Sequence, residues 1–412
     1  MTSPVEERAL ATAEAIYDVI KRELKPHFAE LAGCRSTAEL LGHPRYRALA
    51  TAIERVLETP EQGDFSKDVA PAKDRYRVLA WNLERGIEID RQLEALRTHR
   101  YLSTCDVLLL TETDVGMARS GNRAVAQELA AELGLYYAFV PCYLNLAKGS
   151  GIEYEVDGEN ELGLHGNAVL SRYPIGSVRP IHLKNGKDKM AGREKRLGRQ
   201  TALAAEIEFP NARLNVTAVH LDANSTQRHR HDQMRDVLDG LDGLDADGPL
   251  RQGYGGQVPT ILGGDWNTTT YNSSTAFRAI MGFWLRVFMG VDHVIRNHYL
   301  HPYNRFEKEL FDLLESRGFE YRHSNLIGER TISYDVDDTK TRKNLGEWVP
   351  WWCFAFMRWA LRNHGGRCPL KIDWFATRGV RTENPVVFHE LREGLARPLS
   401  DHDPIGVDVV VE

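Results

Sequence analysis

Cysteine is scarce in this chain of 412 residues, which has five cysteines scattered along its length. None of them forms a Cys-x-x-Cys pair, so their spacing argues against a zinc site and against a disulfide framework. An odd, dispersed set of cysteines is typical of reduced thiols. We therefore expect a cytoplasmic protein.

Long apolar runs and an excess of positive charge are also missing. No stretch reaches the ~18 consecutive apolar residues of a membrane span, and residues 1–19 lack the basic and then apolar pattern of a signal peptide. The net charge is −6, whereas proteins that coat long DNA usually carry a basic surface that neutralises phosphates. DNA coating is therefore disfavoured, although a local basic patch could still bind nucleic acid.

The chain does contain the material for a large core, since 42% of its residues are hydrophobic and 27% are charged. From about residue 75, short runs of strand-like composition recur, most of them rich in β-branched and aromatic residues. These runs are 76–81, 107–111, 136–140, 201–209, 214–221, 258–262, 372–377 and 405–411. Helical patterns lie between some of them, which predicts a layered α/β domain over residues 73–412.

Residues 1–72 have a different pattern and predict an N-terminal helical extension. Apolar residues recur there at helical spacing, namely Tyr17, Ile20 and Leu24 and then Leu49, Ile53 and Leu57. We expect a helical hairpin packed on the main domain, with a dimer contact as the alternative.

A segment at about 270–368 reads as an insertion between two expected strands. It includes a helix expected to begin after Asn304, and two aromatic stretches, 283–289 and 348–357. Two interpretations of the aromatic stretches stay open. They could pack the insertion against the core, or they could form an interfacial surface that inserts Trp and Phe into lipid headgroups.

Polar side chains stand at the ends of several expected strands. Asn82, Glu112 and His220 each end one of the runs, and Asp265 and Asn267 follow another. In an α/β sheet, ligands gather beyond strand ends, where loops are free to carry function. One such carboxylate would more often have a structural role, but five residues suited to a metal ion and a phosphate favour a functional site.

Phosphate-ester cleavage explains these residue types, because it requires charge stabilisation on the phosphoryl oxygens and an activated water. Glu112 can hold a hard cation such as Mg²⁺, which prefers oxygen ligands and retains several waters. Asp265 can orient the attacking water or take its proton. His220 and His402 can donate to the developing negative charge, provided that nearby carboxylates keep them protonated.

Further polar residues complete this chemistry. Asn82 and Asn267 offer amide groups to a metal or a phosphate without adding negative charge. Asp401 is next to His402, and Asp373 lies near the start of an expected strand, so either carboxylate could orient a histidine. The basic segment 184–199 could guide an anionic substrate or be a solvated loop.

Seven short motifs, in this order, resemble those of the endonuclease/exonuclease/phosphatase superfamily, which includes deoxyribonucleases, abasic-site endonucleases and neutral sphingomyelinases. They are Trp81-Asn82-Leu83-Glu84-Arg85-Gly86, Leu110-Thr111-Glu112-Thr113-Asp114, Gly166-Asn167-Ala168-Val169-Leu170-Ser171-Arg172, Val219-His220-Leu221, Gly263-Gly264-Asp265-Trp266-Asn267, Ile372-Asp373-Trp374 and Ser400-Asp401-His402-Asp403-Pro404. The resemblance covers roughly residues 75–412, interrupted by the insertion. It implies a four-layer α/β sandwich with two central mixed β-sheets flanked by helices, and one or two Mg²⁺ or Mn²⁺ ions.

The resemblance also implies a role for each matching residue. The implied metal site comprises Glu112, Asn82 and Asp401. The implied catalytic set comprises Asp265, His220, His402, Asn267, Asp373 and Asp401. Within that set, Asp265 would activate water, Asn267 would bind phosphate, and the two histidines would stabilise the transition state.

The sequence therefore predicts a cytoplasmic Mg²⁺- or Mn²⁺-dependent hydrolase of phosphate esters, with a phosphodiester as the expected bond. Its substrate stays open between nucleic acid, a phospholipid headgroup and a small phosphorylated metabolite. A membrane surface stays open as a partner through the aromatic insertion, and the oligomeric state is not predicted. The alternative function is a catalytically silent scaffold that binds a phosphate ligand.

Overall fold

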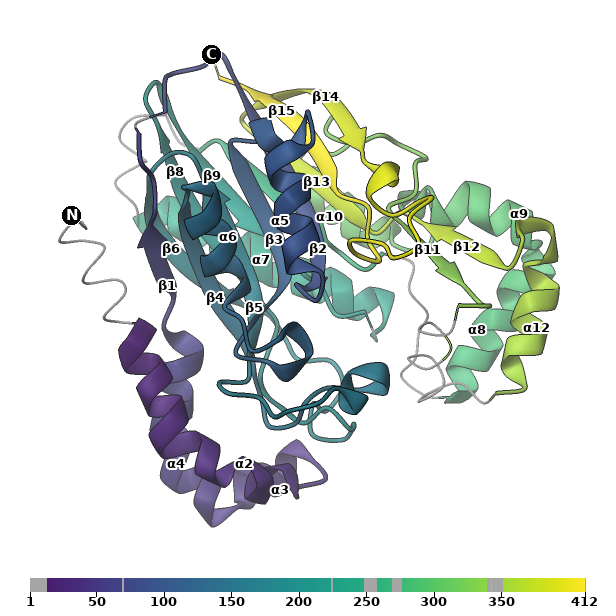
Figure 1. Ribbon diagram of the computed structural model, residues 1–412. Helices are drawn as coiled ribbons and strands as arrows, with labels where there is room; N and C mark the ends of the chain where they lie inside the picture. The colour runs from purple at the N-terminus through teal and green to yellow at the C-terminus, as the bar shows by residue number, and fades with distance from the viewer. Residues whose placement is uncertain are drawn as a thin grey trace.

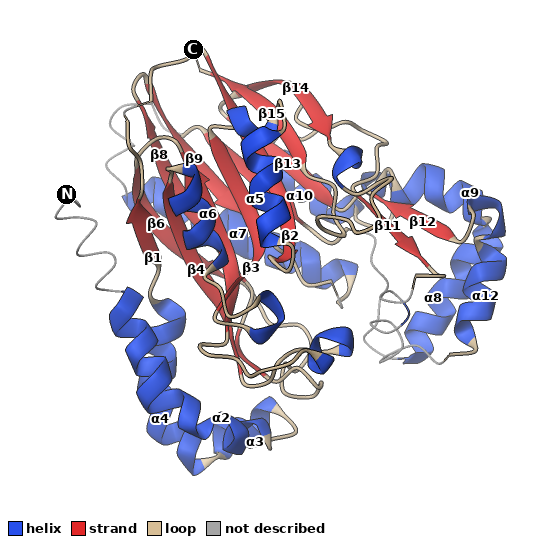
Figure 2. Cartoon of the chain, viewed as in Figure 1, coloured by secondary structure: helices blue, strands red, loops and turns tan. Residues whose placement is uncertain are grey.

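Two β-sheets lie face to face at the centre of the computed structural model, with helices on both outer faces (Figure 1, Figure 2). The structure describes residues 13–68, 70–223, 225–247, 258–268, 276–338, 342 and 351–411. It confirms the predicted α/β sandwich with two mixed sheets and an N-terminal helical region.

The larger sheet runs in the order β1-β4-β5-β3-β2-β15-β14, and β7 also pairs with β4. Its strands are β1 (Glu61–Asp64), β2 (Arg75–Arg85), β3 (Val107–Val115), β4 (Tyr136–Asn145), β5 (Leu164–Ser171), β7 (Arg196–Gly198), β14 (Arg381–Val387) and β15 (Ile405–Val410). Strands β2 and β3 are parallel, whereas the other pairs are antiparallel, so the sheet is mixed.

The smaller sheet runs in the order β13-β10-β9-β8-β6. Its strands are β6 (Ile175–His182), β8 (Thr201–Phe209), β9 (Ala212–Ala218), β10 (Thr260–Asp265) and β13 (Asp373–Arg378). Strands β9 and β10 are parallel, so each sheet contains one parallel pair. Parallel neighbours end at the same edge of a sheet. Asn82 and Glu112 lie toward the ends of β2 and β3, Asp265 ends β10, and His220 follows β9.

Alternation along β2 shows how the layers form, because successive side chains of a strand point to opposite faces. Val78 and Ala80 belong to the apolar core between the two sheets. Leu79 and Trp81 belong to a second core, under the helices that cover the outer face of the larger sheet. A third core lies between the smaller sheet and its own helices.

The helices divide between these outer layers and the two added segments. They are α2 (Phe28–Ala32), α3 (Thr37–Gly42), α4 (Pro44–Glu58), α5 (Ile89–Thr98), α6 (Val125–Leu133), α7 (Gln227–Asp247), α8 (Ala276–Met289), α9 (Val291–Val294), α10 (Lys308–Ser316) and α12 (Cys353–Ala360). Single turns of 3₁₀- or π-helix are Ile20–Leu24, Lys25–His27, Leu102–Thr104, Ala118–Ser120, Gly151–Glu155, Ile295–Tyr299, Pro302–Asn304, Arg362–His364 and His389–Leu391. Helices α5 and α6 cover the larger sheet, and α7 and α10 cover the smaller one (Figure 1). None of the helices that the structure describes combines the length and apolar character needed to cross a bilayer.

Strand β10 carries two glycines, Gly263 and Gly264, where it lies close to the larger sheet. A Cβ atom at Gly263 would lie 2.7 Å from Leu109 Cδ1 of β3, in the other sheet. At Gly264, whose φ is +137°, a Cβ atom would lie 2.3 Å from the Val219 carbonyl oxygen. Only glycine fits this approach, which brings the end of β10 against the larger sheet.

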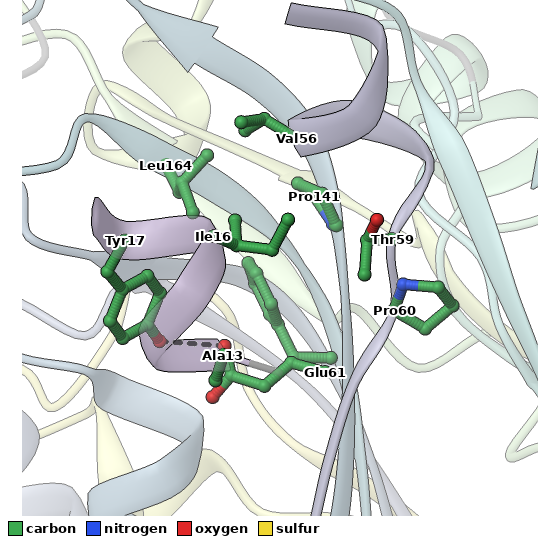
Figure 3. Close-up of a pocket in the computed structure, with 10 residues that line it drawn as sticks. Ala13, Ile16, Tyr17, Val56, Thr59, Pro60, Glu61, Pro141 and Leu164 are labelled. Atoms are coloured by element: carbon green, nitrogen blue, oxygen red, sulfur yellow. Dashed lines mark hydrogen bonds between the residues drawn. The ribbon is translucent and has the colours of Figure 1, made fainter. Parts of the chain in front are cut away.

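The N-terminal extension packs on the edge of the larger sheet. Residues 13–19 are helical and lead into the turns and helices that end with α4. Tyr17 donates to the buried Glu61 carboxylate at 2.7 Å (Figure 3). Tyr137 of β4 donates to the same carboxylate at 2.6 Å. Residues 61–64 lie within the predicted extension but form β1, which pairs with β4. Residues 1–12 of that prediction lie outside the described residues, and its boundary at residue 72 stays a prediction.

The predicted insertion has its own small apolar core, which includes Val294, Ile295, Leu361 and Leu370. It also contains a two-stranded ribbon of β11 (Ile332–Asp335) and β12 (Arg367–Leu370). The aromatic stretch at 348–357 is described only from residue 351 onward.

The helix expected to begin after Asn304 begins later, at Lys308, so this prediction was wrong by several residues. Asn304 instead ends a separate turn, Pro302–Asn304. Arg305 follows that turn with φ −154°, outside the helical region, so the chain cannot continue directly into α10.

Replacing Tyr17 by Phe tests how the extension is held. The change leaves the buried Glu61 carboxylate with one donor fewer, which we expect to lower the free energy of unfolding by about 1–3 kcal/mol. Urea unfolding followed by circular dichroism measures the change. The matched control is Tyr46→Phe, because the Tyr46 hydroxyl makes no hydrogen bond among the described residues, and we expect a loss below about 0.5 kcal/mol. Equal losses in both variants would contradict the assigned role of the Tyr17–Glu61 contact.

Candidate active site

Asp265, the last residue of β10, is the centre at which the predicted residues meet. It is buried, and its Oδ2 atom accepts hydrogen bonds from the side-chain amides of Asn82 and Asn267, each at 3.1 Å. Its Oδ1 atom accepts from the Asn267 backbone N–H at 2.9 Å. The Asn267 amide also donates to the Leu221 carbonyl oxygen at 2.9 Å, so this side chain orients Asp265. The expected Asn267 contact to phosphate stays a prediction.

Both predicted histidines point an Nε2 atom at Asp265. His220 Nε2 lies 3.5 Å from Asp265 Oδ2 and 3.8 Å from Glu112 Oε1. His402 Nε2 lies 3.7 Å from Asp265 Oδ2, while its Nδ1 atom is hydrogen-bonded to Asp373 Oδ2 at 2.9 Å. Asp373 is the strand partner of Asp265 on β13, so the β10–β13 pairing brings the two carboxylates together.

Asn82 and Glu112 lie at irregularities inside their strands, although the sequence places them at strand ends. The register shifts between Asn82 and Arg85 on β2, and between Leu110 and Thr113 on β3, after which both strands continue. Glu112 has a φ of +53° and Asn267 a φ of +50°, which is a costly conformation for a non-glycine residue. Bulges of this kind turn side chains out of the regular alternation and occur often beside active sites.

Arg85 is a residue of this site that the sequence reasoning missed. Its Nη1 atom lies 3.1 Å from Glu112 Oε2, and its Nε atom lies 2.7 Å from Glu153 Oε1. Burial would raise the pKa of Glu112, but Arg85 and then His220 outweigh that effect and hold the pKa well below its usual range. Glu112 is therefore an anion even though it is buried. Arg85 stands within the first motif, but an arginine after a strand has no distinctive sequence signal.

The two histidines differ in charge. Burial alone would lower the pKa of His402, but Asp373 and then Asp265 raise it well above its ordinary value, so His402 is an imidazolium. Burial lowers the pKa of His220 to about 4, because the charge of Glu112 only partly compensates, so His220 is neutral at pH 7. Burial raises the pKa of Asp265 to about 8, against the opposing effect of His402. The condition that nearby carboxylates keep the histidines protonated is thus met at His402 and not at His220.

Two sets of side chains are candidates for a metal ion. Among the described residues, Asp265, Asp373 and His402 bring one ligand atom each within 4.8 Å of the others. His402 Nδ1 is already bound to Asp373 and the ring is cationic, so this group fits proton transfer better than a cation.

Glu112 fits a divalent cation better. Its carboxylate is anionic, and the neighbouring strand β2 carries Asn82 opposite Thr111. The Asn82 Oδ1 atom accepts a hydrogen bond from the Glu84 backbone N–H at 2.9 Å, and its second lone pair would be the neutral oxygen ligand. Mg²⁺ keeps several waters and needs few protein ligands. The third predicted ligand, Asp401, has a half-exposed side chain whose Oδ1 atom lies 4.0 Å from His402 Nε2. The residues present therefore fit the predicted group, with Glu112 as the main ligand.

The insertion contributes residues to the site that the sequence did not single out. Thr331 Oγ1 accepts hydrogen bonds from the backbone N–H groups of Ile372 and Asp373, at 3.1 and 3.0 Å. Burial, and then the charges of Asp401 and Asp265, raise the pKa of Tyr334 on β11. Ile332 forms an isolated antiparallel bridge with His402. The part of the insertion next to the sheets, which includes Thr331 and Ile332 and is called the root of the insertion below, thus supports the Asp373–His402 pair.

The basic segment 184–199 makes more internal contacts than either sequence interpretation assumed. Lys189 Nζ lies 2.8 Å from Asp222 Oδ1, and Lys184 Nζ lies 3.3 Å from Asp236 Oδ1. Its Asp188 carboxylate accepts hydrogen bonds from Thr37, at the start of α3, at 2.6 Å or more. Several of its charges are therefore used in holding the loop to the rest of the fold.

A model of the endonuclease/exonuclease/phosphatase family matches residues 79–402, which include every residue of this site. The chain belongs to this family. Membership supports a phosphoester hydrolase that depends on a divalent metal ion. A search among curated proteins found no match.

Solved structures with low sequence identity match most of the chain, with TM-scores below 0.5. A family protein from Leptotrichia buccalis is 11% identical, with a TM-score of 0.45, and the match covers 82% of this chain and 100% of that one. The catalytic domain of human Nocturnin, with a bound sulfate anion, is 15% identical, with a TM-score of 0.42 and coverage of 85% and 96%. An AP endonuclease from Archaeoglobus fulgidus is 13% identical, with a TM-score of 0.43 and coverage of 81% and 98%.

Replacing Asp373 by Asn tests the electrostatic account of His402. The change removes the main charge that raises the pKa of His402, so we expect this pKa to fall toward its ordinary value. Proton NMR titration of the imidazole in the presence of a chelator measures it, with a His402→Asn variant to assign the resonance. Asp401→Asn is the control and should have a smaller effect, because the Asp401 carboxylate is farther away and half exposed. An unchanged pKa in Asp373→Asn would contradict the assignment.

Proposed function

We propose that this protein is a Mg²⁺- or Mn²⁺-dependent hydrolase that cleaves phosphate esters, with a phosphodiester as the expected bond, by in-line attack of water activated at Asp265. The observation that carries the proposal is the crowding of four site side chains around one oxygen atom, Asp265 Oδ2. Two amides donate to it at 3.1 Å, and two histidine Nε2 atoms lie within 3.7 Å.

Asp265 is suited to act as the general base. Asn82 and Asn267 fix the orientation of its carboxylate, so that little reorganisation is needed when water binds. Burial raises its pKa to about 8, so its ionised form, whose fraction grows as the pH rises toward 8, is a stronger base than an ordinary carboxylate. In this proposal the proton of the attacking water moves to Asp265 as the new phosphorus–oxygen bond forms and the opposite phosphorus–oxygen ester bond breaks. The leaving oxygen departs with the bonding electron pair and takes a proton from solvent, and Asp265 then returns its proton to solvent.

His402 is suited to stabilise the negative charge that develops on the phosphoryl group. Asp373 binds its Nδ1 atom and thereby fixes the ring, which leaves Nε2–H directed into the site. His220 is neutral, so it would donate to the same group through an Nε2–H tautomer. Asp401 would support the His402 charge from the solvent side of the ring.

Glu112, Asn82 and Asp401 would hold the cation. When bound, a divalent ion neutralises charge on the phosphoryl oxygens and favours hydroxide over water. Arg85 pairs with Glu112 across 3.1 Å, and it would compensate the charge of this carboxylate before a cation arrives. The strained backbone at Glu112 keeps its carboxylate aimed at the site.

The substrate stays open between nucleic acid, a phospholipid headgroup and a small phosphorylated metabolite, and the cytoplasm stays the proposed compartment. The internal ion pairs of segment 184–199 leave fewer charges to guide a long nucleic acid. The silent-scaffold alternative predicts phosphate binding without turnover, so a turnover assay separates the two functions.

Hydrolysis of bis(p-nitrophenyl) phosphate and p-nitrophenyl phosphate tests the proposal. We expect turnover with Mg²⁺ or Mn²⁺, its loss with chelator, and a faster rate for the diester. Asp265→Ala should lower kcat by about 10²–10⁴-fold because it removes the base. Glu112→Ala should raise the metal concentration needed for half-maximal activity.

The control for this assay is Glu383→Ala. Glu383 lies on β14, away from the site, and forms surface ion pairs with Arg75 of β2 and Arg381 of β14. We therefore expect unchanged activity. Asp265→Ala with wild-type turnover would remove Asp265 from its role. Turnover that persists in chelator would contradict the metal dependence.

A further inference from the structure

Helix α8 of the insertion exposes large apolar side chains and buries a charged one, the reverse of what is expected for a helix on a globular surface. Its exposed side chains include Phe277, Met281, Leu285 and Phe288, which recur at helical spacing, and Phe288 is 83% exposed. Its buried side chain is Arg286, which donates to the Gly282 carbonyl oxygen at 2.9 Å and lies over the Phe306 ring. Surface helices normally bury the apolar face and expose the charged one.

Residues 351–362, which include α12, extend this apolar surface. Trp351 is 84% exposed, and Trp352, Phe356 and Trp359 are also exposed. Trp284 of α8 packs against Phe356 of α12 with 5.9 Å between ring centres, so the two helices form one continuous face. Figure 1 shows α8 and α12 side by side, at the opposite end of the molecule from the N-terminal helices.

The only charged residues of these two segments are arginines. Segments 276–289 and 351–362 contain two arginines each and no acidic residue, whereas the whole chain carries a net charge of −6. Arg278, Arg358 and Arg362 are exposed beside the aromatic side chains. Arg362 lies over the Trp359 ring at 5.1 Å, and Arg358 Nη2 lies 3.3 Å from Asp337 Oδ2 at the margin of the surface.

We propose that the surface formed by segments 276–289 and 351–362, the docking surface, binds an anionic phospholipid bilayer. Trp and Phe enter the headgroup region, and arginines pair with lipid phosphates. A symmetric contact with a second copy of this chain would instead bring together two patches whose only charges are positive, since a two-fold interface uses the same surface patch on both subunits. The charge of the docking surface thus favours an anionic lipid over self-association.

The docking surface is joined to the candidate active site through the root of the insertion. After α12, the chain enters β12, and β12 leads directly into Asp373. β11 pairs with β12 and bridges to His402 through Ile332. Binding to a bilayer would therefore hold the site at an anionic lipid surface. The proposal concerns where the protein acts, and it does not depend on the proposed hydrolysis.

Co-sedimentation of the full chain with vesicles tests the proposal. We expect binding to vesicles of phosphatidylcholine mixed with phosphatidylserine, and weaker binding to phosphatidylcholine alone. The double change Phe288→Ser with Trp351→Ser should weaken binding by at least about tenfold, because each exposed aromatic side chain loses its apolar contact with lipid. Arg358→Gln with Arg362→Gln should remove the preference for phosphatidylserine.

Three controls distinguish vesicle binding through the docking surface from a loss of folding, from non-specific binding by exposed apolar side chains, and from an effect of catalysis. Thermal unfolding should be unchanged in the Phe288→Ser, Trp351→Ser variant, since both side chains are exposed. Leu41→Ser changes an exposed apolar side chain on α3 and should bind vesicles like the wild type. Asp265→Ala should also bind like the wild type, so a failure of the proposed hydrolysis would leave this result intact.

Several outcomes would overturn the proposal. The first is no binding of the wild-type chain to either vesicle, and the second is equal binding by the Phe288→Ser, Trp351→Ser variant. Sedimentation velocity supplies the third. A wild-type dimer that this double change converts to a monomer would show that the face is a contact between copies of the chain.

Discussion

The close approach of the two sheets at Gly263 and Gly264 is the constraint on which the site depends. Any side chain at these positions would meet Leu109 of the larger sheet or the Val219 carbonyl oxygen within 2.7 Å. Because the glycines remove that obstacle, Asp265 at the end of the smaller sheet comes within hydrogen-bond distance of Asn82 in the larger one. The site is therefore assembled from both sheets, and the sandwich must be intact for it to exist.

Several ionisable groups are buried together where the ends of the two sheets meet. The charge of each group shifts the pKa of its neighbours and so sets their protonation states. Glu112 stays ionised because the charge of Arg85, above all, offsets its burial. Burial raises the pKa of Asp265 although two amides donate to its carboxylate. Asp373 makes His402 a cation, whereas burial keeps His220 neutral. A general base, a positive donor and an anionic ligand for a cation can thus lie within one small site, each in a different protonation state.

The fold class followed from the sequence because strand-like runs and helical patterns are local signals. The runs near residues 107, 201 and 405 correspond to β3, β8 and β15. Site residues could be proposed for a similar reason, since polar side chains such as Asp265 interrupt otherwise apolar runs. Their roles stay predictions, because the fold and the family do not test them.

Other features could not be predicted, because they depend on contacts between distant segments. Arg85 matters only through its distance from Glu112, and Thr331 only because it caps the start of β13. The bulges at Asn82 and Glu112 appear in the pairing register and not in the composition. The exposure of Phe288 and Trp351 shows that these two side chains do not pack on the core, whereas Met289 and Met357 of the same stretches do contact the core of the insertion. Contact of the aromatic stretches with lipid stays a proposal.

The central claim is that Glu112 marks the cation site, while Asp265, Asp373 and His402 form a separate group for proton transfer. An anomalous difference map from crystals soaked in Mn²⁺ tests it most directly. The account predicts a peak at the Glu112 carboxylate, beside Asn82. A peak enclosed by Asp265, Asp373 and His402, with none at Glu112, would contradict it.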